Sequence, residues 1–295
     1  MRAALYRGPR EKSTKRMRRP HRRGVEYAIG ILHMNTTPAA WSALAADNES
    51  ELLAFLGTAA CATSHRATDL TWVVTGVPAE NFNGVIWARL SAEEADVQVP
   101  AMVEQFRFQG LPAVWRLDPA SEPDDLGARL TALGCEPVAD TVRMGAPLTG
   151  LAREMSRFPG LTVDRVTTTN EMADWLDVWS ATSAEARGPR EALYGSLAPG
   201  VRQPLQHYVA RIDGEPAGVA ELFLGQRAAG LYSLSVAPAY RGRGIGTALV
   251  LTPLLVARTL GYEVGVVQPG DDSRLMFEHL GFDIVPHPSI GYRIA

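Results

Sequence analysis

A glycine-rich loop between a short strand and a long apolar helix constrains this fold more than any other feature. The run 236–247 reads Val-Ala-Pro-Ala-Tyr-Arg-Gly-Arg-Gly-Ile-Gly-Thr, and the helix expected over 244–260 is apolar on almost every side. A helix of that kind must be buried, here against a sheet holding the strands expected at 231–236 and 263–267. The segment therefore predicts a parallel strand–helix–strand crossover in a mixed α/β domain.

The rest of the second half surrounds this crossover with strands and helices. Thr168 and Glu171 form a capping box that opens a helix, and Asp213-Gly214 suits the type I′ turn of a hairpin. The expected order is strand 161–166, helix pair 168–198, hairpin strands 207–212 and 217–224, strand 231–236, helix 244–260, strand 263–267, helix 272–279, and strands 283–285 and 290–294.

The first half of the chain is also expected to contain both helices and strands. Its expected order is helical stretches 39–44 and 49–60, strands 70–77 and 84–89, helix 95–108, strand 113–117, helix 123–133, and a strand pair closing near Met144. Glycine and proline over 145–150 are expected to interrupt both helix and strand, which makes that segment a linker. The 295 residues therefore divide into a tail (1–33), a first domain (34–150) and a second domain (151–295).

The tail (residues 1–33) and the body of the chain (residues 34–295) carry net charges of opposite sign. The chain has a net charge of −3, of which +8 lies in residues 1–33 and −11 in the remainder. The tail lacks apolar periodicity and a signal-peptide core, so we expect it to be disordered, with Met34 as an alternative start. The acidic body is unsuited to nucleic acid, and binding through the basic tail is the remaining alternative.

Several other classes are unsupported by the composition. The sequence has no run of about 20 apolar residues that could span a membrane, and its histidines and two cysteines lack metal-binding spacing. The wide separation of Cys61 and Cys135 indicates a reducing compartment, so we expect a cytoplasmic protein without a metal.

The glycine-rich loop has the chemistry of a pyrophosphate cradle. Glycines at alternate positions leave backbone N–H groups open to an anion, and the helix start adds its positive dipole end. Arg241 and Arg243 add formal charge. The spacing fits neither a dinucleotide GxGxxG nor a Walker loop, because the third glycine is missing and residues 34–295 contain no lysine. A structural turn with solvated arginines is the alternative.

The same residues resemble the GNAT acetyltransferases, whose signature is (Q/R)xxGxG/A between a strand and a long helix. Arg241 to Gly246 supply it, and the segment 274–282, ending in Leu-Gly-Phe, looks like the family's later helix. The resemblance covers about residues 160–295. It implies a central, mixed, mostly antiparallel sheet flanked by helices, the fold of acyl-CoA N-acyltransferases.

The resemblance also implies acetyl-CoA as cosubstrate. Its pyrophosphate would bind amides of 242–247, its pantetheine arm would lie along 234–236, and a backbone N–H of that strand would stabilise the oxyanion. Gly270 stands where the family commonly has Asn, so Gln268 and Ser273 are expected to substitute. The expected cofactor-binding residues are Leu234, Ser235, Val236, Arg241, Gly242, Arg243, Gly244, Ile245, Gly246, Thr247, Gln268 and Ser273.

The sequence offers fewer candidates for catalytic residues than for cofactor-binding residues. Glu221 is the expected base, with Tyr232 behind it; a strand carboxylate and a packed aromatic are the ordinary alternatives. The family often has a proton-donating Tyr where this chain has Phe277, so that acid is missing. Trp175, Trp179 and Tyr194 either wall an acceptor pocket or belong to the core.

A repeated spacing of residues in the first half indicates that the fold of the second half is duplicated there. Asp124-Asp125 and Leu133-Gly134 repeat the spacing of Asp271-Asp272 and Leu280-Gly281, yet the region 91–109 has no glycine and is acidic. We therefore expect a degenerate GNAT-like copy without cofactor, with an unrelated α/β domain as the alternative.

Together these features predict an acetyl-CoA-dependent N-acetyltransferase acting on a primary amine of a small molecule or peptide. Polyamines, aminoglycosides and peptide amino termini are equally compatible with an acidic body, and the oligomeric state is open. The alternative function is a non-catalytic acyl-CoA-binding sensor or regulatory module.

Overall fold

The computed structural model describes residues 37–138, 142–151, 158–183, 187–197, 203–286 and 290–294. The basic tail and Met34 lie outside the described residues, as do the predictions made for them. The elements of the first half are α1 (Pro38–Leu56), β1 (Thr63–Arg66), β2 (Leu70–Val74), η1 (Glu80–Phe82), β3 (Asn83–Ala88), α2 (Ala92–Gln109), β4 (Ala113–Leu117), α3 (Leu126–Ala132), β5 (Glu136–Pro137), β6 (Arg143–Pro147) and η2 (Leu148–Gly150).

The second half follows the expected order closely. Its elements are β7 (Leu161–Arg165), α4 (Thr169–Thr182), α5 (Arg187–Leu197), β8 (Leu205–Ile212), β9 (Glu215–Leu224), β10 (Ala229–Val236), η3 (Pro238–Tyr240), α6 (Ile245–Thr259), β11 (Val264–Val267), α7 (Arg274–His279), β12 (Asp283–Val285) and β13 (Ile290–Ile294).

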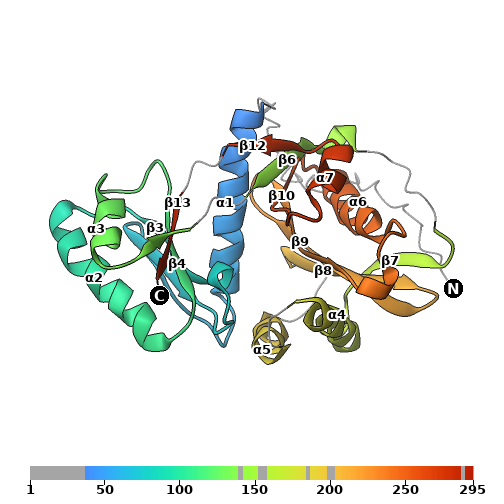
Figure 1. The fold of residues 1–295 in the computed structure, drawn as a ribbon, viewed down its shortest axis with the longest axis horizontal. Helices are drawn as coiled ribbons and strands as arrows, with labels where there is room; N and C mark the ends of the chain where they lie inside the picture. Colours follow the sequence, from blue (N-terminus) through green and yellow to red (C-terminus); the bar gives the residue numbers. More distant parts are fainter. Residues whose placement is uncertain are drawn as a thin grey trace, which may run out of the picture. The chain divides into compact units, whose positions relative to one another are not determined.

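Over the described ranges these strands form two sheets (Figure 1). The first has the order β1-β2-β3-β4-β13-β5 and the second the order β12-β6-β11-β10-β9-β8-β7. Each contains one parallel strand pair, β3 with β4 across α2 and β10 with β11 across α6, and the remaining ladders are antiparallel. The mixed, mostly antiparallel fold with helices on its faces is confirmed, and the same strand–helix–strand unit occurs in both halves.

Each sheet contains one strand from the other half of the chain. β6 lies between β12 and β11 in the second sheet, and β13 lies between β4 and β5 in the first. The expectation that residues 145–150 interrupt strand structure is therefore wrong for 145–147, because antiparallel pairing to β11 satisfies this backbone. Gly145 also leaves room for Trp41, since a Cβ there would lie 3.0 Å from the Trp41 Cβ. The boundary near residue 150 stays a prediction.

Helix α1 connects the two sheets. It packs against β2 and β3 of the first sheet and against β6, β10, β11 and β12 of the second (Figure 1). The two helical stretches expected at 39–44 and 49–60 are one continuous helix, and that part of the prediction is wrong. Asn48, a poor helix former, is buried inside it and donates from Nδ2 to the Ala228 carbonyl at 2.8 Å. This tertiary bond compensates for its low helix propensity.

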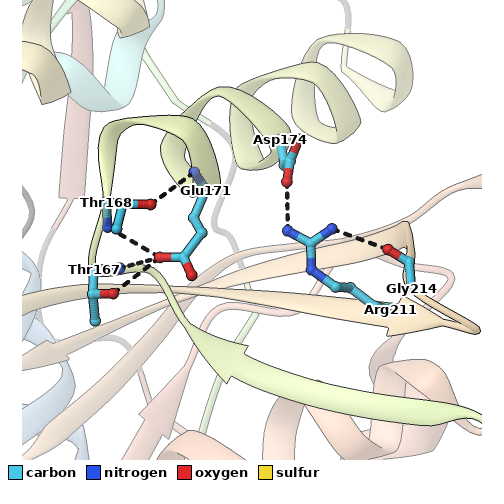
Figure 2. Close-up of polar contacts among 6 residues, drawn as sticks. All are labelled: Thr167, Thr168, Glu171, Asp174, Arg211 and Gly214. Carbon is cyan, nitrogen blue, oxygen red and sulfur yellow. Dashed lines mark hydrogen bonds and ion pairs between the residues drawn. The ribbon is translucent and has the colours of Figure 1, made fainter.

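Helix α4 is fixed over the second sheet by two sets of polar contacts (Figure 2). The predicted capping box is confirmed: the Glu171 N–H donates to the Thr168 Oγ1 at 3.2 Å, and the Thr168 N–H donates to the Glu171 carboxylate at 3.0 Å. One turn later Asp174 pairs with Arg211 of β8, whose guanidinium also donates to the Gly214 carbonyl. These contacts hold α4, which carries Trp175 and Trp179, over the face of the sheet.

Candidate active site

A cavity of about 220 Å³ lies where α1 and η1 of the first half meet α4, α5, β9 and β10 of the second. Four of its lining residues, Glu221, Tyr232, Ser233 and Gln268, include both predicted catalytic candidates and one predicted cofactor-binding residue. Leucines of α1 and Phe82 of η1 complete the wall. The first half therefore supplies part of the cavity.

A bulge in the predicted hairpin sets the surroundings of Glu221. The turn residues Asp213 and Gly214 have positive φ values of 49° and 90°, as a type I′ turn requires. The register then shifts between Ala210 and Arg211, which places His207 opposite Glu221. Without the shift His207 would face Ala220, so one inserted residue brings imidazole and carboxylate together.

The Glu221 carboxylate is buried, with 3% of the residue exposed. The Ser233 hydroxyl donates to its Oε2 at 2.8 Å. Its Oε1 lies 3.4 Å from the His207 Nε2 and 3.9 Å from an Arg190 nitrogen, and among the described residues it has no aligned hydrogen-bond donor. Oε1 is thus a buried carboxylate oxygen beside two cationic or polar side chains of the cavity wall.

Glu221 is held ionised by its neighbours. Burial by itself raises the pKa of the Glu221 carboxyl, but His207 and Arg190 outweigh it and hold the pKa below its usual value. At neutral pH the cavity therefore presents a carboxylate.

Arg190 is enclosed by aromatic rings. Its guanidinium carbon lies 4.5 Å from the ring centre of Phe82 and 4.3 Å from that of Trp179. A guanidinium N–H donates to the Tyr194 hydroxyl at 2.8 Å. Cation–π contacts of this kind stabilise a cation removed from water. The charge beside Glu221 is thus fixed in place.

Tyr232 is set differently from Glu221. The two are direct cross-strand partners on β9 and β10, but the Tyr232 hydroxyl donates to the Asn48 Oδ1 at 2.7 Å. Burial raises the pKa of Tyr232 well above its usual value, and Glu49 raises it further. Tyr232 is therefore a neutral phenol at neutral pH, and its proton is directed at Asn48. The catalytic role expected for Tyr232 stays a prediction.

The glycine loop has the backbone of an anion site. Gly242 and Gly244 adopt left-handed φ values of 75° and 74°, and a Cβ on either would meet nothing within 4 Å. Gly244 is the N-cap of α6 and provides no side-chain hydrogen bond to the helix, so the first amides of this helix remain for a ligand. Arg241 and Arg243 are exposed beside them.

The loop connects directly to the cavity through β10. This strand pairs with β11 only from Ala229 to Leu231, although β10 continues to Val236. A second register shift lies between Tyr232 and Ser235, and Ser233 has a φ of +49°, unusual for a residue other than glycine. Leu234, Ser235 and Val236 are half-buried and lie beyond Val267, the last residue of β11 and the last one paired to β10.

The other predicted cofactor residues surround the loop and the strand. Ile245 is 1% exposed with its side chain in the core, and Thr247 lies half-buried in the first turn of α6. Gln268 follows the end of β11 and lines the cavity. Ser273 precedes α7 and donates from Oγ to the Gly270 carbonyl at 3.0 Å. The structure brings these positions to one end of β10 and β11; their roles stay predictions.

Phe277 belongs to the core. It is 2% exposed and packs edge-on against Phe282, with ring centres 5.4 Å apart. A hydroxyl at this position would be buried among apolar side chains. We expect Phe277→Tyr to give no gain in kcat and to lower the free energy of unfolding by about 1–3 kcal/mol. Denaturant unfolding and a rate assay check this; a more active Phe277→Tyr variant would show that the position reaches the reacting atoms.

The aromatic residues of α4 and α5 divide between wall and core. Trp179 and Tyr194 line the cavity, whereas Trp175 is fully buried behind them and donates from Nε1 to the Ala220 carbonyl at 3.2 Å.

Sequence reasoning missed His207, Arg190, Asn48, Glu49 and Phe82. His207 could have been suspected from its place on the strand paired with Glu221. Arg190 has no sequence signal, and the other three enter through the packing of the two halves.

The described residues contain neither a metal-binding cluster nor a membrane-spanning helix. No group of three or more His, Cys, Asp or Glu side chains there is arranged to hold a metal ion. No helix in that part of the chain has both the length and the apolar character needed to span a membrane.

Residues 170–282 match the family model described as "Acetyltransferase (GNAT) family". A GCN5-related N-acetyltransferase from Kribbella flavida has a similar structure, with a TM-score of 0.60 and 16% sequence identity, over 85% of this chain and 95% of that one. A tandem GNAT protein from the clavulanic acid biosynthesis pathway aligns with a TM-score of 0.55 and 14% identity, over 86% of this chain and 92% of that one. No curated protein matches the sequence.

A third structure is the GCN5-related glucosamine N-acetyltransferase region of a fungal multi-domain GH3 β-N-acetylglucosaminidase. It aligns with a TM-score of 0.55 and 16% identity, over 83% of this chain and 34% of that one. At such identities these likenesses show the fold. Residues 170–282 match the GNAT acetyltransferase family model, and the fold of the chain is that of GNAT proteins, a tandem GNAT protein among them.

Proposed function

We propose that this protein transfers an acetyl group from acetyl-CoA to a primary amine, with one active site in the second half. The observation that carries the proposal is the continuity of the site: β10 runs from the uncapped glycine loop of α6 to a cavity containing a buried carboxylate. The residues fit an acyl-CoA, because the left-handed glycines leave the α6 amides open and β10 continues beside them without a β11 partner beyond Leu231.

The roles of the cofactor-binding residues follow from this placement. Backbone amides of 242–247, with Arg241 and Arg243, would hold the pyrophosphate, and Leu234 to Val236 would border the pantetheine arm. Gln268 and Ser273 would contact that arm from the other side. Acetyl-CoA supplies an activated acetyl thioester, and a fixed backbone N–H of β10 would stabilise negative charge on the acyl oxygen without reorganisation.

Glu221 would accept the proton of the attacking amine. The Arg190 guanidinium, 3.9 Å from the Glu221 Oε1, disfavours an ammonium at the same place and so promotes its deprotonation. Ser233 and His207 would hold the carboxylate in position. Because Tyr232 remains a neutral phenol, we assign it to positioning α1 through Asn48 rather than to proton abstraction.

The first domain, proposed as residues 34–150, would have no cofactor of its own. Its crossover helix α2 is capped by Ser91 in a complete capping box with Glu94, and Glu93 and Glu94 lie in its first turn. The Glu94 amide is thus occupied, and the start of the helix carries negative charge that would repel a phosphate. We propose that this domain serves the acceptor side of the cavity, and that the protein is cytoplasmic, with Cys61 and Cys135 unpaired as the structure has them.

The alternative is an acyl-CoA-binding sensor without turnover, which the buried Phe277 favours because no proton donor stands at that position. A thiol-release assay on the full chain, with acetyl-CoA and a panel of amines, separates the two. We expect amine-dependent release of CoA thiol. Tight acetyl-CoA binding with no amine-dependent release would support the sensor and overturn the enzyme.

A further inference from the structure

From the cavity walls we infer that the acceptor is a compact monoamine with an apolar or aromatic body. This inference rests on the proposed function, because it names the substrate class of that same site. Of the acceptors compatible with the sequence, polyamines and aminoglycosides are expected to be poor substrates.

Size is the first argument. The cavity of about 220 Å³ is smaller than the roughly 300–1,000 Å³ typical of drug-sized ligands. At about 30 Å³ per water it corresponds to about seven waters, or an organic molecule of about ten non-hydrogen atoms. An aminoglycoside has several times that size.

The character of the wall is the second argument. The wall is mixed, and its apolar part consists of Leu52, Leu53 and Leu56 of α1 together with Phe82, Trp179 and Leu205. These side chains offer a ligand no charge and few hydrogen bonds, whereas burying the hydrocarbon body of an amine against them is favourable by about 25 cal/mol per Å².

Charge pairing is the third argument. The two carboxylates among the described cavity residues are Glu49 and Glu221. Glu49 pairs with Arg143 and also with Arg116 at 3.4 Å, and Glu221 lies beside Arg190 and His207. A polyamine would bring two or more ammonium groups next to carboxylates already compensated by guanidinium groups, at a large desolvation cost. A monoamine deprotonated at Glu221 brings no such charge.

The experiment compares amines of matched size on the full chain. 2-Phenylethylamine and spermidine have nine and ten non-hydrogen atoms, about the size the cavity admits, and kanamycin represents the aminoglycosides. We expect kcat/KM for 2-phenylethylamine to exceed that for spermidine by at least about tenfold, a difference of about 1.4 kcal/mol, and kanamycin to be inactive.

A cavity-filling variant locates the body of the acceptor. Ala79 lines the cavity from the first half, and Ala79→Phe is expected to lower kcat/KM for 2-phenylethylamine at least about tenfold while changing that for propylamine less than about threefold. Ala132→Phe, at an exposed site on α3, should change neither. Denaturant unfolding establishes that the Ala79→Phe variant is folded. Equal loss of both amines by the folded variant would overturn this placement.

The outcomes distinguish this inference from the proposed function. Preference for spermidine or kanamycin would overturn the inference and leave the acetyltransferase standing. Calorimetric binding of 2-phenylethylamine without thiol release from any amine would overturn the acetyltransferase and leave the ligand class standing. Absence of 2-phenylethylamine binding at millimolar concentration would overturn the inference.

Discussion

Replacing Glu221 by glutamine is expected to lower kcat by about 10²–10⁴-fold at neutral pH, the range typical of losing a general base. The amide keeps the shape of the carboxylate and can accept the hydrogen bond from Ser233, but it cannot take a proton. Acetyl-CoA affinity should not change, because the glycine loop is separate from this carboxylate. The measurement is steady-state thiol release together with calorimetric titration of acetyl-CoA.

Glu215→Gln is the matched control, since Glu215 lies on the same strand and is exposed; we expect it to leave kcat within about twofold. A Glu221→Gln variant retaining more than about a third of the wild-type kcat would remove Glu221 from the chemistry and return it to the role of a paired strand carboxylate.

The Glu221→Gln substitution is also expected to change how the free energy of unfolding depends on pH in the acid range. The pKa of Glu221 is lower in the folded chain than its usual value, so its ionised form stabilises the fold above an unfolded-state pKa of about 4.3, and this stabilisation is lost as the pH falls through the folded value. Between about pH 6 and pH 3 the wild type should therefore lose more free energy of unfolding than Glu221→Gln. Denaturant unfolding at several pH values measures the difference.

Ile294→Ala is expected to lower the free energy of unfolding by about 2–4 kcal/mol. Ile294 ends β13, is 3% exposed, and packs with Trp115 and Phe106 in the core of the first sheet. The chain's last strand thus stabilises its first domain. Guanidinium unfolding followed by tryptophan fluorescence measures the loss.

Ile290 provides the control on the same strand, because it is 57% exposed; Ile290→Ala should cost less than about 0.5 kcal/mol. Equal costs for the two variants would mean that β13 does not complete the first sheet in solution.

Local patterns predicted most of the fold. The apolar helix after the glycine loop, the Thr168–Glu171 capping box and the Asp213-Gly214 turn each depend on residues close in sequence, and the structure contains all three. The exchange of β6 and β13 between the sheets was not predictable in this way, since short strands carry no information about which sheet they will join.

The site shows the same division. The cradle could be located because its glycines and helix start are contiguous. His207 meets Glu221 only because of a bulge in β8 and β9, and a bulge depends on packing that no turn motif specifies. Asn48 and Phe82 come from the first half through tertiary contact, so the acceptor wall could not be derived from the second half alone.

Calorimetric titration of acetyl-CoA into the full chain, beside Gly244→Glu and Gly261→Glu, tests the central claim most directly. Both glycines have left-handed φ values with no atom within 4 Å of a built Cβ, one at the start of α6 and the other just after its end. The strain of substitution is therefore matched, and only Gly244→Glu places a carboxylate in the cradle. We expect one site per chain in the wild type and in Gly261→Glu, and at least about a hundredfold weaker binding in Gly244→Glu. Unchanged binding in Gly244→Glu, or none in the wild type, would contradict the acyl-CoA site and the acetyltransferase that depends on it.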